Sequence, residues 1–92
     1  MLNLMLNPAE RKALRARAHK LEPVVMIGGK GLTDEVIAEI ERALAVHELI
    51  KVRAAGLGRE ARQQALPIIC RKTAAEPVQQ VGKIFVIFRK KP

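Results

Sequence analysis

Three segments of the chain show apolar positions at helical spacing. The first begins with Asn7 as a capping residue, Pro8 in the first turn and Glu10 to complete a capping box, and it should end near Lys20. The second follows Thr33, a good capping residue, and the third is expected from Arg59 to about Thr73. The positions predicted to face inward are Ala9, Ala13, Leu14, Ala16 and Leu21, then Val36, Ile37, Ile40, Ala43 and Leu44, and then Ala61, Ala65, Leu66 and Ile69.

Four shorter segments have the pattern of strands. Residues 24–27 form a continuous apolar run, which is typical of a strand covered on both faces. Residues 49–53 alternate, and residues 77–81 and 83–89 flank a tight turn at Gly82-Lys83. Pro67 lies within the third predicted helix, where it costs about 3 kcal/mol, so that helix either bends or restarts there.

The order α-β-α-β-α-β-β predicts an α/β (α+β) fold with a small mixed four-stranded sheet packed by three helices. We expect parallel pairing with right-handed crossovers in both βαβ units and an antiparallel final hairpin. A chain of 92 residues has room for one domain, 1–92, with a core of about 6–89.

The net charge of the chain limits the classes of partner that it is expected to bind. The formal net charge is +8, which favours an anionic partner, and the aromatic content of 2% disfavours an aromatic base-stacking surface. Residues 1–31 and 56–92 carry net charges of +4 and +6, whereas residues 32–55 carry −2. We therefore expect the outer face of the second helix to point away from the partner; its acidic residues are Asp34, Glu35, Glu39 and Glu41.

Several function classes lack the residues they need. The single cysteine, Cys70, excludes an intramolecular disulfide and a cysteine-based zinc site, and we expect it to be buried or half-buried. His47 is predicted to pack or to cap its helix, and no catalytic or metal-ligating set can be assembled. We expect no enzyme activity, no cofactor and no small-molecule substrate. No apolar run is long enough to span a membrane, and Met1–Leu6 lacks the features of a signal peptide, so we expect a cytoplasmic protein that starts at Met1 or Met5.

Three glycines and a lysine, Gly28-Gly29-Lys30-Gly31, lie between a predicted strand and a helix start. Glycine allows close approach of another chain, and a helix start offers unpaired N–H groups to an anion. The loop is thus a candidate clamp for a sugar-phosphate backbone, or else simply a tight turn. Its spacing matches neither a nucleoside-triphosphate loop nor a dinucleotide fingerprint.

Basic residues should gather around this loop, because ligands of open α/β sheets bind at the carboxyl ends of parallel strands. We expect the N-terminal half of the first helix to approach the same end of the sheet, together with the start of the third helix and, if the third strand is parallel, the last turn. The candidate RNA-contacting residues are Gly28, Gly29, Lys30, Gly31, Arg11, Lys12, Arg15, Arg59, Arg62 and Lys83, with His19 either a phosphate contact or a solvated surface residue.

The segments 21–25, 27–33, 43–44 and 47–52 together resemble the YhbY-like CRM (chloroplast RNA splicing and ribosome maturation) domain family. The similarity extends from about Leu6 to Arg89, and Pro67 departs from the expected pattern. The resemblance implies a fold similar to the C-terminal domain of translation initiation factor three. It also implies RNA binding through the G-x-x-G loop and neighbouring basic surface, and action on precursors of the large ribosomal subunit. We expect the protein to be a monomer. Alternatives are a module that docks an acidic protein, a DNA-binding protein and an undetected enzyme.

Overall fold

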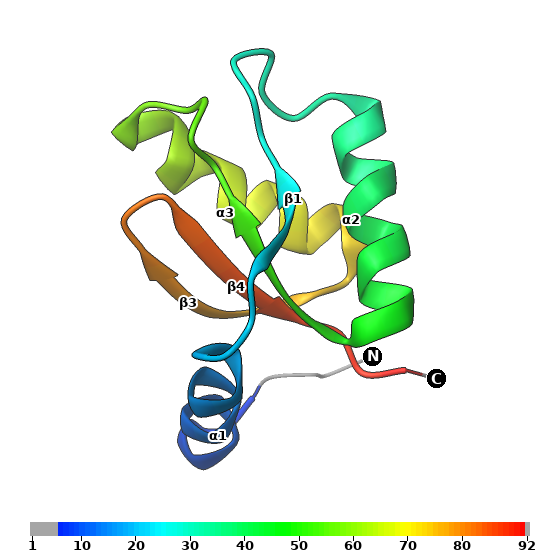
Figure 1. The fold of residues 1–92 in the computed structure, drawn as a ribbon, viewed down its shortest axis with the longest axis vertical. Helices are drawn as coiled ribbons and strands as arrows, with labels where there is room; N and C mark the ends of the chain where they lie inside the picture. Colours follow the sequence, from blue (N-terminus) through cyan, green and yellow to red (C-terminus); the bar gives the residue numbers. More distant parts are fainter. Residues whose placement is uncertain (1–5, 92) are drawn as a thin grey trace.

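The computed structural model describes residues 6–91 and contains three helices and four strands in the predicted order (Figure 1). Their bounds are α1 Pro8–Ala18, β1 Pro23–Met26, α2 Asp34–His47, β2 Leu49–Arg53, α3 Arg59–Thr73, β3 Glu76–Val81 and β4 Ile84–Phe88. The predicted caps form, because the Asn7 and Glu10 side chains each accept the other's backbone N–H, and Thr33 Oγ1 accepts Val36 N–H. The question of a start at Met1 or Met5 lies outside the described residues.

The strand order in the sheet is β1-β2-β4-β3. β1 pairs with β2 in parallel, whereas β4 pairs antiparallel with both β2 and β3. The expectation of parallel pairing in both βαβ units is therefore wrong for the second unit: β2 and β3 run in the same direction, but β4 lies between them. The short Gly82-Lys83 turn folds β4 back beside β3, and the apolar β4, buried along Phe85–Ile87, takes the central position.

Two apolar cores lie on opposite faces of the sheet. The larger core joins α2 and α3 to one face, and its fully buried side chains include Ile40, Leu44, Ile69, Phe85 and Ile87. On the other face, α1 contributes only Leu14 and Ala18 to a smaller core; their sheet partners are Leu49, Val78 and Val86. The two helices on one face cover more of the sheet than the single short helix on the other.

Several predictions are wrong because α1 covers less of its face of the sheet than α2 and α3 cover of the other face. Ala9, Ala13 and Ala16 are exposed, because Leu14 and Ala18 are the residues of α1 that are buried against the sheet. The helix also ends at Ala18 rather than near Lys20. β1 is covered on one face only: Val25 and Ile27 are buried, but Val24 and Met26 are 46% and 58% exposed. The continuous apolar run in residues 24–27 therefore belongs to an edge strand with one open face.

Helix α3 continues through Pro67 without a break, which settles the question of a restart. Pro67 is exposed and has no N–H to donate to the carbonyl of Gln63, which is also an exposed residue. Ala65 and Ile69 are buried and Leu66 packs against them as predicted, whereas Ala61 in the first turn is exposed. Within residues 6–91, no helix is both long and apolar enough to cross a lipid bilayer.

Candidate nucleic-acid interface

Three loops meet where β1, β2 and β3 finish, and we call residues 28–31, 54–58 and 82–83 the loop end of the sheet. Arg53 carbonyl oxygen accepts Ile27 N–H at 2.8 Å, and Ile27 carbonyl oxygen accepts Gly56 N–H at 2.9 Å. Ala54 N–H donates to Lys83 carbonyl oxygen at 2.7 Å, which ties the β3–β4 turn to the same place. The predicted convergence of the glycine loop, the start of α3 and Lys83 is therefore present.

Gly56 packs directly against the glycine loop, and no sequence pattern singles it out. A Cβ at this position would lie 2.1 Å from the carbonyl carbon of Gly28 and 2.5 Å from the nitrogen of Gly29. No side chain fits at that distance. The loop of residues 54–58 must therefore have only backbone at Gly56, so that the loop of residues 28–31 can pack against it. A single glycine in an A-G-L-G stretch gives no sign of such a contact, since the partner is 28 residues away in the chain.

Gly28 and Gly29 differ from Gly56, because the fold does not require glycine at either position. A Cβ on either residue would meet nothing within 4 Å, and neither has a positive φ. Both are exposed, as is Lys30. Within residues 6–91, the N–H groups of Gly29 and Lys30 make no hydrogen bond. This loop therefore presents open backbone with unpaired donors.

Gly31 closes the loop and has a structural reason to be glycine. Its φ is +76°, in the left-handed region, and its N–H donates to Gly28 carbonyl oxygen at 3.0 Å. Thr33 N–H donates back to Gly31 carbonyl oxygen at 3.0 Å and the chain then enters α2. The turn thus accounts for Gly31 but not for Gly28 or Gly29.

The cations at the loop end are of two kinds. Lys30, Arg59 and Lys83 are exposed, and within the described part of the chain their side chains make no hydrogen bond or ion pair. Arg62 is half-buried, and its guanidinium donates to Leu57 carbonyl oxygen at 3.0 Å. Arg62 consequently supports the 54–58 loop, while the other three point positive charge outward.

The first helix does not reach the loop end, which corrects the expected placement of Arg11 and Lys12. α1 lies at the opposite end of the molecule from residues 28–31 (Figure 1). The Arg11 guanidinium donates to the carbonyl oxygens of Pro77, at the start of β3, and of Leu6. Leu14 and Ala18 anchor the helix on the far half of the sheet, so only its C-terminal part, with Arg15 and His19, borders the open sheet face.

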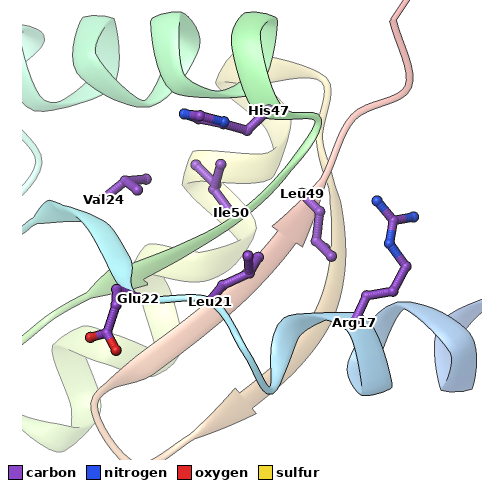
Figure 2. Close-up of a pocket in the computed structure, with 7 residues that line it drawn as sticks. All are labelled: Arg17, Leu21, Glu22, Val24, His47, Leu49 and Ile50. Atoms are coloured by element: carbon purple, nitrogen blue, oxygen red, sulfur yellow. The ribbon is translucent and has the colours of Figure 1, made fainter.

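A hollow of about 280 Å³ lies at the far end, between the end of α2 and the start of β1 (Figure 2). His47 lines it from the last turn of α2 and is exposed, so of the two expected roles it does not pack in the core, whereas its position at the C-terminal end of the helix agrees with the other. Figure 2 shows Arg17 and Glu22 on opposite sides of the apolar residues Leu21, Leu49 and Ile50. The polar side chains do not converge on one point and form no reactive set.

Other groups with chemical potential are isolated. Cys70 is half-buried as predicted; burial, and secondly the Glu76 carboxylate, raises the pKa of its thiol from 9.0 to about 11. The thiol is therefore a poor nucleophile at neutral pH. Among residues 6–91, no three His, Cys, Asp or Glu side chains are grouped so that they could hold a metal ion.

Comparison with protein families gives a match to the CRS1 / YhbY (CRM) domain over residues 6–89. A Haemophilus influenzae RNA-binding protein is 50% identical over 84 residues, which cover 91% of this chain and 85% of that protein. A probable RNA-binding protein of Pseudomonas aeruginosa is 38% identical over 89 residues, covering 97% of this chain and 86% of that protein.

The fold is similar to a solved structure as well. The solution structure of a hypothetical protein from Staphylococcus aureus superposes with a TM-score of 0.84 at 30% sequence identity. The match covers 96% of this chain and 92% of that one. The three-helix, four-stranded mixed architecture therefore extends over nearly the full length of both proteins.

Proposed function

Because the chain belongs to the CRS1 / YhbY (CRM) domain family, we propose that it is a cytoplasmic, monomeric RNA-binding protein that grips the sugar-phosphate backbone at the loop end of its sheet. The observation that carries this proposal is the unexplained glycine at positions 28 and 29. The fold has room for a side chain at both. The fold therefore does not explain why these two residues are glycines. A ligand that approaches their bare backbone closely does explain it.

The loop end provides the groups that a phosphodiester needs. The unpaired N–H groups of Gly29 and Lys30 are hydrogen-bond donors for phosphate oxygens. Lys30, Arg59 and Lys83 add three exposed cations around them. Arg62 acts indirectly, because it holds the 54–58 loop on which the glycine loop rests. Recognition should therefore follow backbone and shape more than base sequence.

We further propose that the RNA is ribosomal and that the protein acts on precursors of the large ribosomal subunit, as the family resemblance implies. The test is sedimentation of a lysate through a sucrose gradient at low salt, with and without RNase. Co-migration with large-subunit precursors that RNase abolishes supports the proposal. Migration as free protein in both samples contradicts it.

A second measurement separates RNA from the other partners. Affinity for an RNA hairpin and for a DNA hairpin of matched length is compared across salt concentrations. With three to five phosphate contacts, the logarithm of the affinity should fall with the logarithm of salt at a slope of roughly −2 to −4. Tighter binding to RNA with this slope is expected. Preference for DNA, or capture of an acidic protein that persists after nuclease treatment in place of RNA binding, contradicts the proposal.

A further inference from the structure

The sheet face that carries α1 is only half covered, and the uncovered half adjoins the loop end. Strand register places Met26, Arg53, Ile84 and Val81 in one row across all four strands, in the order β1, β2, β4 and β3. This row is the last one before the three loops. We call it the open row.

Large apolar side chains are concentrated on this face. Met26 is 58% exposed and Val81 60% exposed, and Val24 on the same face is 46% exposed. Among the described residues, four large apolar side chains are this exposed, and the remaining one, Val46, is on α2. Apolar side chains gathered on one face of a small basic protein indicate a contact surface.

Between the open row and α1 there is a hollow of about 250 Å³. Its walls include the basic residues Arg15 and Lys51, together with His19, and the apolar residues Val81, Ile84 and Val86. No carboxylate lines it, whereas Arg15 and Lys51 are basic and Arg53 stands in the adjoining row. The positive charge around the hollow favours an anionic ligand. The apolar side chains that line it favour a ligand that also has an uncharged flat or hydrophobic group.

We infer that the open row and this hollow hold unpaired nucleotides of a single-stranded RNA segment that continues from the phosphate site at the loop end. One base lies against Ile84 and Val81 beside the hollow, and a neighbouring base lies against Met26, three strand spacings (roughly 14 Å) away at the opposite edge of the row. The basic side chains contact the flanking phosphates. This inference rests on the proposed function and adds to it the class of RNA that is bound: RNA with at least one unstacked base next to the backbone grip.

A double-stranded RNA would not use these residues. An A-form helix presents phosphates and 2′-hydroxyl groups, and its bases remain stacked inside. The apolar side chains of the open row would then gain nothing from contact. A splayed base, in contrast, offers a large weakly polar face, and an arginine guanidinium such as that of Arg53 can stack on it in place of an aromatic ring. The hollow is also smaller than the roughly 300–1,000 Å³ of pockets that enclose an entire small-molecule ligand.

The test compares two RNAs and three proteins. The probes are a short uridine oligonucleotide and a fully paired RNA hairpin with the same number of phosphates. The double variant Met26→Gln with Val81→Gln removes apolar surface without a change of charge, at positions exposed enough for the fold to tolerate it. The matched control is Val46→Gln, since Val46 is an equally exposed valine (63%) outside this face.

We expect the double variant to bind the uridine oligonucleotide about fivefold to tenfold more weakly. This loss of affinity is at the lower end of the range for removal of one base contact. Its affinity for the paired hairpin and its thermal unfolding should match those of the wild type, and Val46→Gln should change neither affinity. Equal weakening for both RNAs, or no weakening for either, overturns the inference. Unchanged RNA binding with weaker self-association in ultracentrifugation also overturns it, since the face would then join two copies of the chain.

A third variant separates this inference from the function on which it rests. Lys30→Glu should weaken the binding of both RNAs, because phosphates are common to them. If Lys30→Glu has this effect and the double variant has none, the backbone grip stands and the base site is wrong. If the wild type binds neither RNA, the proposed function itself fails.

Discussion

Two arginines at the far end of the sheet are engaged within the fold, whereas three cations at the loop end are exposed. At the far end, where α1, the start of β3 and the end of β4 meet, Arg11 donates to backbone carbonyls and Arg89 joins the Glu41 carboxylate to the carbonyl of Thr73. At the loop end, Lys30, Arg59 and Lys83 contact no such group among residues 6–91. The net charge of +8 alone does not distinguish these ends. A cation engaged within the fold contributes stability, whereas a solvated one remains available to a partner.

The glycines show the same division within the loop end itself. Gly56 is required because its Cβ would strike the backbone of Gly28, while Gly28 and Gly29 have open space around them. The fold therefore explains the glycine at position 56 but not those at positions 28 and 29, for which RNA binding is the proposed reason. The variants below test whether structural and binding residues can be separated in this way.

The largest effect is expected from Gly56→Ala. The new methyl group would lie 2.4 Å from the Gly28 carbonyl oxygen, so both loops must move. We expect a loss of about 3 kcal/mol in the free energy of unfolding, as for overpacked sites, and a drop in Tm of roughly 12–24 °C. Thermal denaturation measures it. In the control Gly58→Ala, where a Cβ meets nothing within 4 Å, the loss should stay below about 1 kcal/mol.

Gly29→Val should separate binding from folding. A valine here has room in the free protein but covers the exposed backbone that RNA is proposed to approach. We expect Tm to change little and RNA affinity to fall about thirtyfold, equivalent to the loss of one hydrogen bond to a charged group. Fluorescence anisotropy with an RNA hairpin measures the affinity.

Glu39→Gln is the control for that variant, since Glu39 is exposed on the outer face of α2. Glu41 does not serve this purpose: it was expected on the same outer face, but it is half-buried and paired with Arg89. If Gly29→Val binds as tightly as Glu39→Gln, the glycine loop is only a turn.

Lys30→Glu and Lys90→Glu compare the two ends directly, because both variants change the net charge by the same amount. Lys30 is at the loop end and Lys90 follows β4 at the far end. We expect Lys30→Glu to weaken RNA binding about tenfold and to make the salt dependence shallower by roughly one phosphate contact. Lys90→Glu should weaken it twofold at most. Similar losses would mean that RNA responds to the overall charge and not to the loop end.

Sequence patterns predicted most of this architecture because the elements have strong local signals. The capping residues Asn7 and Thr33 fixed two helix starts, and the spacing of Ile40 and Leu44 identified the buried face of α2. The location of the glycine loop and Lys83 at the same end of the sheet agrees with the expectation for a third strand that runs in the direction of the first two.

The incorrect predictions concern contacts between distant parts of the chain. No local pattern says that β4 inserts between β2 and β3, that α1 crosses the far half of the sheet, or that Gly56 touches Gly28. The open face of β1 was also hidden, because an edge strand with exposed Val24 and Met26 has the same apolar run as a buried one. The proposed base site rests on that open face.

The smallest effect is expected from Glu41→Gln at the far end. Arg89 comes from the end of β4 and reaches both the Glu41 side chain on α2 and the Thr73 carbonyl at the end of α3, so it connects three elements. Loss of the carboxylate charge should reduce the free energy of unfolding by about 1 kcal/mol, because the pair is partly solvated and Arg89 retains its bond to Thr73. Urea denaturation measures that loss, and the affinity for the RNA hairpin should remain within twofold of wild type. A variant that loses affinity while keeping its stability would place Glu41 in the binding surface and would remove the distinction between the two ends.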